Sequence, residues 1–176
     1  MTVIDLPIEG AKVLSTAPFR DARGTFEVFW EQADLQAAGM LFVPASACHS
    51  YNQKAGMLRG MHFQRVPYGQ TKLVSCVQGS AWDVMVDLRP ASPTYLRWHG
   101  ETLEPASGRT VFVPAGCAHG FLALKDETTI AYLIAGDYKP AASEVVRWND
   151  PAFGIEWPMT DPVLSERDRV APDFVP

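Results

Sequence analysis

Cysteine is scarce in this chain of 176 residues, which contains only Cys48, Cys76 and Cys117. Their number is odd and no two of them have the CxxC spacing, so the sequence predicts neither a disulfide framework nor a zinc site. Because free thiols persist in reducing compartments, we expect the protein in the cytoplasm.

Long apolar runs are also missing. The opening residues, MTVIDLPIEGAKV, lack the basic start and apolar centre of a secretion signal, and no later stretch approaches the roughly 18 apolar residues of a membrane span. We therefore expect no targeting segment and no membrane partner.

Basic residues are in deficit, with 15 Lys and Arg against 20 Asp and Glu and a net charge of -5. The two signs are mixed along the chain, whereas nucleic acids and anionic membranes attract clustered basic residues. The sequence therefore argues against a nucleic-acid partner and leaves room for a small anion held by a few arginines.

Apolar residues are abundant. Hydrophobic residues make up 47% of the chain and aromatic residues 11%, which suffices for the core of one domain over residues 1–176. Stretches rich in β-branched and aromatic residues recur between Gly and Pro at 57–64, 72–78, 81–88, 109–114, 119–124 and 128–135. This pattern predicts an all-β sandwich or barrel. Helical patterns occur only at 31–39 and 161–168, where Ser165 could cap a short turn and Arg167 or Asp168 could point inward.

One stretch suggests a local pairing of strands. In KLVSCVQGSAWDVMVDLR, residues 72–89, apolar and polar side chains alternate roughly on both sides of Gly79 and Ser80. Gly and Ser are common in tight hairpin turns. The simplest interpretation is a two-stranded hairpin.

The strongest local pattern is GRTVFVPAGCAHG, residues 108–120, in which glycines and a proline lead to His119. It resembles the second signature of the cupin jelly roll. The first signature is half present, because Gly56 precedes His62 at the matching distance while Gln64 replaces the second histidine and no glutamate stands near Gly69. A metal cupin needs about three histidines and one carboxylate. The resemblance therefore implies a pocket without a metal.

Seven segments then follow in a fixed order: RDARGTF, GMLRGMHFQRVPYGQTKLV, GSAWDVMVDLRPASPTY, VPAGCAHGF, the segment from Tyr132 to Tyr138, VVRWNDPAFGIEWP and VLSERD. Together they resemble the dTDP-4-dehydrorhamnose 3,5-epimerase family, from about Phe19 to Asp168. The resemblance implies a cupin-type jelly-roll barrel with short peripheral helices. It also implies an epimerase that uses no cofactor and inverts C3, C5 or both of a nucleotide-linked 4-keto-6-deoxy sugar.

The resemblance assigns four catalytic residues. His62 matches the base that removes a proton next to the ketone, and Asp168 matches the carboxylate that orients the imidazole and stabilises the imidazolium. Tyr132 matches the donor that protonates the opposite face of the sugar. Lys72 matches the lysine whose ammonium stabilises charge on the C4 oxygen.

The same resemblance implies contacts with the substrate, a nucleoside diphosphate sugar. Arg23 and Arg59 match arginines that hold the diphosphate or nucleotide, a role that suits the guanidinium. The family's dimers exchange amino-terminal strands, so we expect a homodimer in which Arg23 reaches the neighbouring site. Asp83 lies in a matching segment, but an internal structural role is at least as well supported. Further expected substrate contacts are His119, Tyr138, Gln64, Phe26 and Arg167.

Three places depart from the family's pattern: Val28, Ala47-Cys48-His49 and Ser143. They correspond to nucleotide and sugar contacts, so the identity of the nucleotide and of the sugar stays open. Four alternatives also remain: a keto-isomerase, an epimerase of one carbon, a metal-dependent cupin and a sugar-binding module without catalysis.

Overall fold

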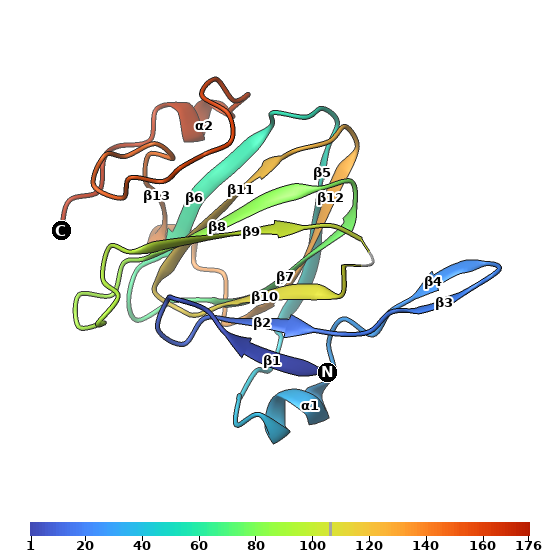
Figure 1. Ribbon diagram of the computed structural model, residues 1–176. Helices are drawn as coiled ribbons and strands as arrows, with labels where there is room; N and C mark the ends of the chain where they lie inside the picture. The colour runs from blue at the N-terminus through green and yellow to red at the C-terminus, as the bar shows by residue number, and fades with distance from the viewer. Residues whose placement is uncertain (106) are drawn as a thin grey trace.

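The computed structural model describes residues 1–105 and 107–176 of the chain. In this part, two antiparallel sheets face each other as a jelly-roll barrel (Figure 1). In spatial order, the six-stranded sheet contains β1 (Thr2–Asp5), β2 (Lys12–Ser15), β10 (Arg109–Val113), β7 (Thr71–Gln78), β12 (Thr128–Ala135) and β5 (Ser46–Asn52). The five-stranded sheet contains β13 (Ser143–Val145), β6 (Leu58–Gln64), β11 (Cys117–Ala123), β8 (Ala81–Asp87) and β9 (Trp98–Leu103). The predicted all-β cupin-type fold is confirmed.

The space between the sheets is filled by apolar side chains from both of them. Val74 and Ile130 of the six-stranded sheet pack with Ala81, Met85 and Phe121 of the five-stranded sheet, and all five are buried. Burial of apolar area at about 25 cal/mol per Å² is the main force that holds two such sheets together. This core lies beside the site described below.

The hairpin predicted for residues 72–89 is wrong. Its two halves are β7 and β8, which belong to different sheets, so Gly79 and Ser80 form a crossing between sheets. The hydroxyl of Thr128 in β12 fixes this crossing, because it accepts a hydrogen bond from the Ser80 N–H at 3.2 Å. A Cβ at residue 79 would lie 2.3 Å from the same hydroxyl oxygen, and Gly79 has a φ of +81°. Alternation along each strand is the same in both arrangements and could not distinguish them.

The helices are short and peripheral, as predicted. They are α1 (Gln32–Ala37) and α2 (Glu166–Arg169), and a 3-10 turn spans Pro140–Ala142. The Ser165 hydroxyl caps α2, since it accepts a hydrogen bond from the backbone N–H of Asp168 at 3.2 Å. No helix in the described residues is long and apolar enough to cross a membrane.

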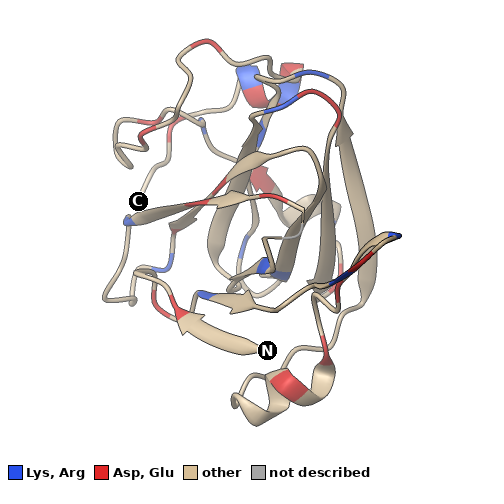
Figure 2. Cartoon of the chain, turned by 45° about the vertical axis from the view of Figure 1, so that its right-hand side comes forward, with Lys and Arg blue, Asp and Glu red and all other residues tan. Residues whose placement is uncertain are grey.

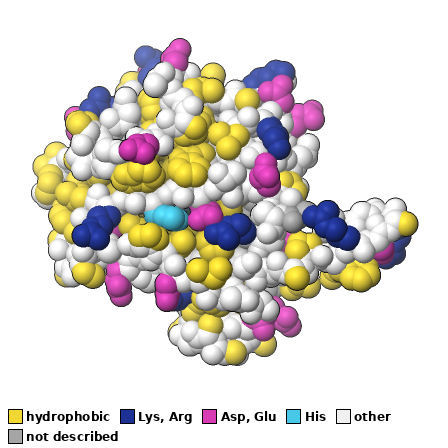
Figure 3. Space-filling model, in the orientation of Figure 1, with side chains coloured by type: hydrophobic (Ala, Val, Ile, Leu, Met, Phe, Trp, Pro, Cys, Tyr) yellow, Lys and Arg dark blue, Asp and Glu magenta, His cyan; other side chains and the backbone are white. Residues whose placement is uncertain are grey.

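A small hairpin stands away from the barrel (Figures 1 and 3). It consists of β3 (Phe19–Asp21) and β4 (Gly24–Phe26), which pair with each other. Both aromatic side chains are open to solvent, with exposed fractions of 62% for Phe19 and 70% for Phe26. A ribbon of two strands is only marginally stable alone, and this one pairs with no other strand in the described residues.

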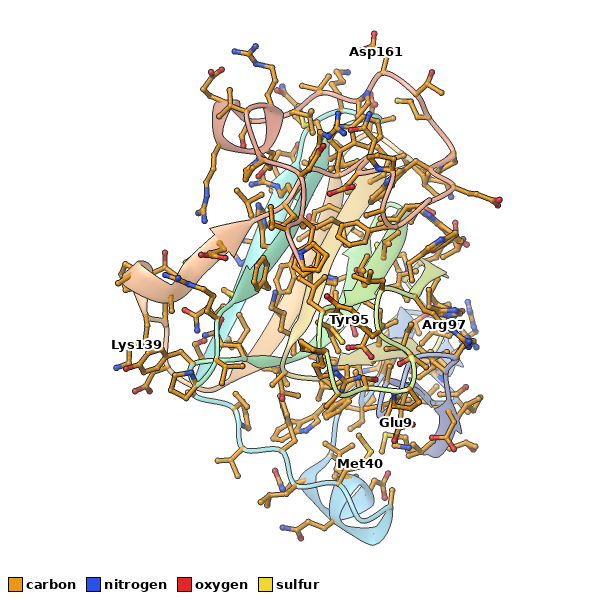
Figure 4. All side chains as sticks on the ribbon, turned by 90° about the vertical axis from the view of Figure 1, so that its left-hand side faces the viewer. Glu9, Met40, Tyr95, Arg97, Lys139 and Asp161 are labelled. Atoms are coloured by element: carbon orange, nitrogen blue, oxygen red, sulfur yellow. The ribbon has the colours of Figure 1, made fainter. Side chains whose placement is uncertain are left out.

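Charged residues of both signs occur side by side over the molecule, for example in α2 and on the β3–β4 hairpin (Figure 2). The loops at the base of the barrel are joined by hydrogen bonds. Figure 4 shows Tyr95 and Arg97 on one loop close to Glu9 on another, and the Glu9 N–H donates to the Thr94 hydroxyl at 3.0 Å.

Candidate active site

Strand geometry places five polar side chains on the inner face of the barrel. Residues two apart in a strand point to the same face. Lys72 therefore shares the inner face with Val74, and Asp83 with Ala81 and Met85. The remaining three belong to β6, β11 and β12: His62, His119 and Tyr132.

His119 adjoins both His62 and Tyr132. It is the register partner of His62 in the β6–β11 pair, so the two side chains lie on one face. The ring of His119 also contacts the ring of Tyr132 edge-on, with 6.1 Å between the ring centres. His62 and Tyr132 thus belong to opposite sheets, and each of them adjoins His119.

Two cavities adjoin His62. One, of about 260 Å³, is lined by His62, Lys72, Tyr138 and Arg167 among others. The other, of about 330 Å³, is lined by His62, Arg59, Arg167 and Asp168 among others. His62 and Arg167 line both cavities, which are of about the size that holds a small-molecule ligand.

His62 and Asp168 form a hydrogen-bonded pair. The distance from His62 Nε2 to Asp168 Oδ1 is 2.6 Å, and the exposed fractions of the side chains are 39% and 4%. Burial raises the pKa of the Asp168 carboxyl, but the bonds from His62, Ser165 and the Gly60 N–H outweigh it and hold this pKa below its usual value. The ionised carboxylate orients the imidazole and stabilises a proton gained by it.

Residues 163–168 bring Asp168 to the barrel. The Leu58 N–H donates to the Val163 carbonyl at 3.0 Å, and the Val163 N–H donates to the Gly56 carbonyl at 2.8 Å. These bonds fasten the segment along the start of β6, and α2 then directs Asp168 inward to His62.

Tyr132 has the properties of a proton donor. Its hydroxyl lies 3.4 Å from the Ser50 Oγ on the neighbouring strand β5. Burial raises the pKa of Tyr132 above its usual value, and this effect exceeds the opposing one of Ser50. The phenol therefore keeps its proton until a strong base forms beside it.

Lys72 offers a cation to the cavity. In the part of the chain that the structure describes, its ammonium forms no hydrogen bond or ion pair with a side chain. Burial lowers the pKa of Lys72 to about 8, although Asp83 opposes the change. An ammonium in such a site can stabilise a developing oxyanion.

His119 and Asp83 form a second, deeper pair. His119 Nε2 lies 2.8 Å from Asp83 Oδ2, and the exposed fractions are 4% and 0%. Burial lowers the pKa of His119, and Asp83 only partly offsets this effect. The imidazole is therefore neutral at neutral pH and can hydrogen-bond a polar ligand group.

The predicted anion-binding residues fall into two groups. Arg59 lines the larger cavity, where its Nε donates to the Asn52 Oδ1 at 2.9 Å, and Arg167 lines both cavities. Arg23 and Phe26 belong to the β3–β4 hairpin, which projects away from the cavities of its own chain (Figure 1). Arg23 is paired there with Asp21 at 2.6 Å.

Gln64 also has its polar groups occupied. Its amide nitrogen donates to the carbonyls of Tyr68 and Asp137 at 2.6 and 3.0 Å, and its oxygen accepts from the Lys139 N–H at 2.7 Å. The Gln64 side chain thereby ties two loops together at the cavity wall.

Two side chains beside the site were not foreseen in the sequence. Ser50 contacts Tyr132, and Asn52 holds Arg59. Both lie on β5, two residues apart and therefore on one face. The alternation of small polar residues from Ser46 to Asn52 was the available signal, once β12 was known to pair with this segment.

A metal centre does not fit these residues. At the cupin ligand positions, His62 is bonded to Asp168, His119 to Asp83, and Gln64 to backbone groups. No group of three or more His, Cys, Asp or Glu side chains within the described residues could hold an ion. A stable transition-metal site needs about three or four such ligands.

Comparisons with known proteins identify the family of the chain. A model of the family described as dTDP-4-dehydrorhamnose 3,5-epimerase matches residues 5–175. A dTDP-4-dehydrorhamnose 3-epimerase of Streptomyces niveus is 42% identical over 173 residues, covering 97% of this chain and 83% of that protein. A dTDP-4-dehydrorhamnose 3,5-epimerase of Mycobacterium tuberculosis is 37% identical over 177 residues, covering 99% and 88%. The crystal structure of dTDP-4-dehydrorhamnose 3,5-epimerase from Bacillus anthracis, with TDP and PPi bound, has a TM-score of 0.94 and 38% identity, covering 98% of this chain and 99% of that one.

The fold, the interior site and these relatives together define a jelly-roll sugar epimerase, which is an isomerase. The chain belongs to the dTDP-4-dehydrorhamnose 3,5-epimerase family.

Proposed function

We propose that the protein inverts C3, C5 or both of a nucleoside diphosphate 4-keto-6-deoxy sugar, and that a dTDP sugar is its first substrate to test. The relatives named above act on dTDP-linked sugars, which supports this substrate class. The single observation that carries the proposal is that His62 and Tyr132 belong to opposite sheets and both adjoin His119. Inversion needs a base on one face of a carbon and an acid on the other.

The chemical steps follow from these positions. His62, held by Asp168, takes the proton from the carbon next to the ketone. The electron pair moves to the C4 oxygen, where the ammonium of Lys72 stabilises the negative charge of the enolate. Tyr132 then gives its proton to the same carbon from the opposite face, and the ketone forms again.

Arg59 and Arg167 are proposed to bind the diphosphate, since both border the cavity next to His62. A guanidinium binds phosphate oxygens through two hydrogen bonds at once. We place His119 and Tyr138 against the sugar, and the reaction in the cytoplasm, where the free thiols stay reduced.

A homodimer completes the proposed site. Arg23 and Phe26 stand on an exposed hairpin that pairs with no other strand in the described part of the chain. If the hairpin crosses to a second copy, its exposed rings become covered and Arg23 gains an anionic partner. Val28, one of the positions that differ from the family's pattern, follows this hairpin and is also exposed. It would belong to the same shared surface.

The reaction class is tested by solvent hydrogen. In heavy water, dTDP-4-keto-6-deoxyglucose should gain deuterium at C3, C5 or both, because only these carbons are acidified by the ketone. NMR of the product identifies the labelled and inverted carbons, and GDP, CDP and UDP sugars extend the test to other nucleotides. A product with a moved carbonyl would establish a keto-isomerase, and inversion without deuterium would contradict proton transfer through solvent-exchangeable groups.

The crossing of the hairpin is tested by mixing two defective subunits. We expect Arg23→Ala to lower kcat/KM by about 10- to 100-fold, as loss of a charged hydrogen bond does. When the Arg23→Ala and His62→Asn chains are co-expressed, about half of the dimers contain one chain of each kind, and one of the two sites in such a dimer is intact. The mixture should therefore show about a quarter of the wild-type activity. Each variant alone is the control. Mixed dimers with no recovered activity would show that Arg23 serves its own chain.

A further inference from the structure

A buried carboxylate oxygen next to the site lacks a partner. Asp83 has a side chain with 0% exposure, and its Oδ2 is bonded to His119 Nε2. The other oxygen, Oδ1, has no hydrogen-bond partner among the described residues. A buried carboxylate oxygen without a hydrogen bond is costly, so this state of Asp83 needs a reason beyond packing.

The reason lies across the barrel. Lys72 of β7 and Asp83 of β8 both point inward from opposite sheets, and the Lys72 ammonium has no closer ion-pair partner in the described part of the chain. The two groups form no salt bridge, so the attraction between them acts at longer range through the buried interior. Charges attract one another more strongly in a protein interior than in water, because less water screens them.

The other groups around Lys72 are of a different kind. The titratable side chains facing it are Cys48 on β5, His62 on β6, Cys117 and His119 on β11, and Tyr132 on β12. The adjoining residues of β10, from Val111 to Val113, are apolar. Burial raises the pKa of Cys117 to about 12, so this thiol is neutral. The groups listed here are thiols, imidazoles and a phenol, whereas Asp83 brings a carboxylate to the surroundings of Lys72.

We propose that Asp83 is a positioning residue that keeps Lys72 protonated and fixes His119 as the tautomer with its proton on Nε2. The His119 Nδ1 is then an acceptor for a hydroxyl group of the sugar. The effect of Asp83 on turnover rests on the proposed function, whereas its effect on Lys72 does not. The arrangement explains why a buried aspartate leaves one oxygen unpaired.

The test removes the charge and keeps the shape. In Asp83→Asn, the titration of Lys72, followed by NMR of its Nζ without substrate, should move to lower pH. A shift of about one pH unit would reduce the ammonium fraction at pH 8 from about one half to about one tenth. Turnover should fall about fivefold at pH 8 and little at pH 6.5, so the high-pH limb of kcat moves with Lys72.

Two controls isolate the charge of Asp83. Asp150→Asn removes another buried carboxylate, one that accepts from the backbone N–H groups of Ala152 and Phe174, and should leave the titration of Lys72 unchanged. His119→Gln keeps the Asp83 carboxylate and should leave Lys72 within about 0.3 pH unit of the wild type, whatever its effect on turnover.

The outcomes separate the two proposals. An unchanged Lys72 titration in folded Asp83→Asn overturns the role of Asp83, even if the wild type is an active epimerase. Wild type that is inactive on every 4-keto sugar overturns the proposed function, while the Lys72 titration still tests Asp83. If Asp83→Asn does not fold, NMR of the Asp83 carboxyl carbon in the wild type reports whether this group is ionised. A neutral Asp83 between about pH 6 and 9 would exclude the proposed role.

Discussion

Replacing His62 by asparagine should lower turnover by about 100- to 10,000-fold, the range expected on removal of a general base. Asparagine keeps a polar side chain at the mouth of both cavities but cannot take a proton at neutral pH. The Asp168 carboxylate loses its imidazole partner and remains 96% covered by protein, since its exposed fraction is 4%. Substrate binding should change much less than kcat, because the proposed diphosphate contacts are made by the guanidinium groups of Arg59 and Arg167 and not by the His62 imidazole.

Steady-state kinetics and ligand titration together measure this split between kcat and affinity. His99→Asn is a matched control, because His99 is paired with Glu101 on β9, at the other edge of the five-stranded sheet from β6 and β13. It should retain near-normal turnover. Near-normal turnover of folded His62→Asn would instead show that another group is the base.

Replacing Tyr132 by phenylalanine should reduce formation of inverted product by about 100- to 10,000-fold while exchange with solvent continues. The change removes one hydroxyl and keeps the ring that contacts His119 at 6.1 Å. His62 remains able to take a proton and return a solvent deuteron to the original face. Deuterium should therefore enter substrate that keeps its configuration.

NMR in heavy water measures exchange and inversion in the same sample. Tyr95→Phe is the control, because Tyr95 lies on the loop between β8 and β9 (Figure 4), whereas Tyr132 lies on β12. Equal loss of exchange and inversion in Tyr132→Phe would assign the tyrosine to substrate positioning. Unchanged inversion would identify a different proton donor.

The strands that could be predicted are those with an apolar inner face. Residues 58–64 and 128–135, for example, contain buried apolar side chains and were recognised from composition. Strand β5 could not be found in this way, because Ser46–Asn52 is largely exposed and its inner face carries Ser50 and Asn52. A strand that forms the wall of a polar site has no hydrophobic alternation to detect.

The site shows a similar division. His62 and Asp168 are separated by 106 residues, and no periodicity relates them, so only the resemblance to a family placed them together. The pairing of Asp83 with His119 needed the order of strands, because β8 and β11 are neighbours in space and not in sequence. The wrong hairpin at Gly79 had the same cause, since alternation defines faces but does not choose partners.

The attachment of Asp168 through residues 163–168 has a consequence for proteolysis. Both sheets are complete in sequence by Val145, whereas Asp168 follows on α2. A single cut of the chain between residues 146 and 162 would therefore spare every strand of the two sheets but break the covalent link between His62 and its carboxylate partner. Asp168 would then stay at the barrel through noncovalent contacts, such as the hydrogen bonds of Val163 to residues 56 and 58.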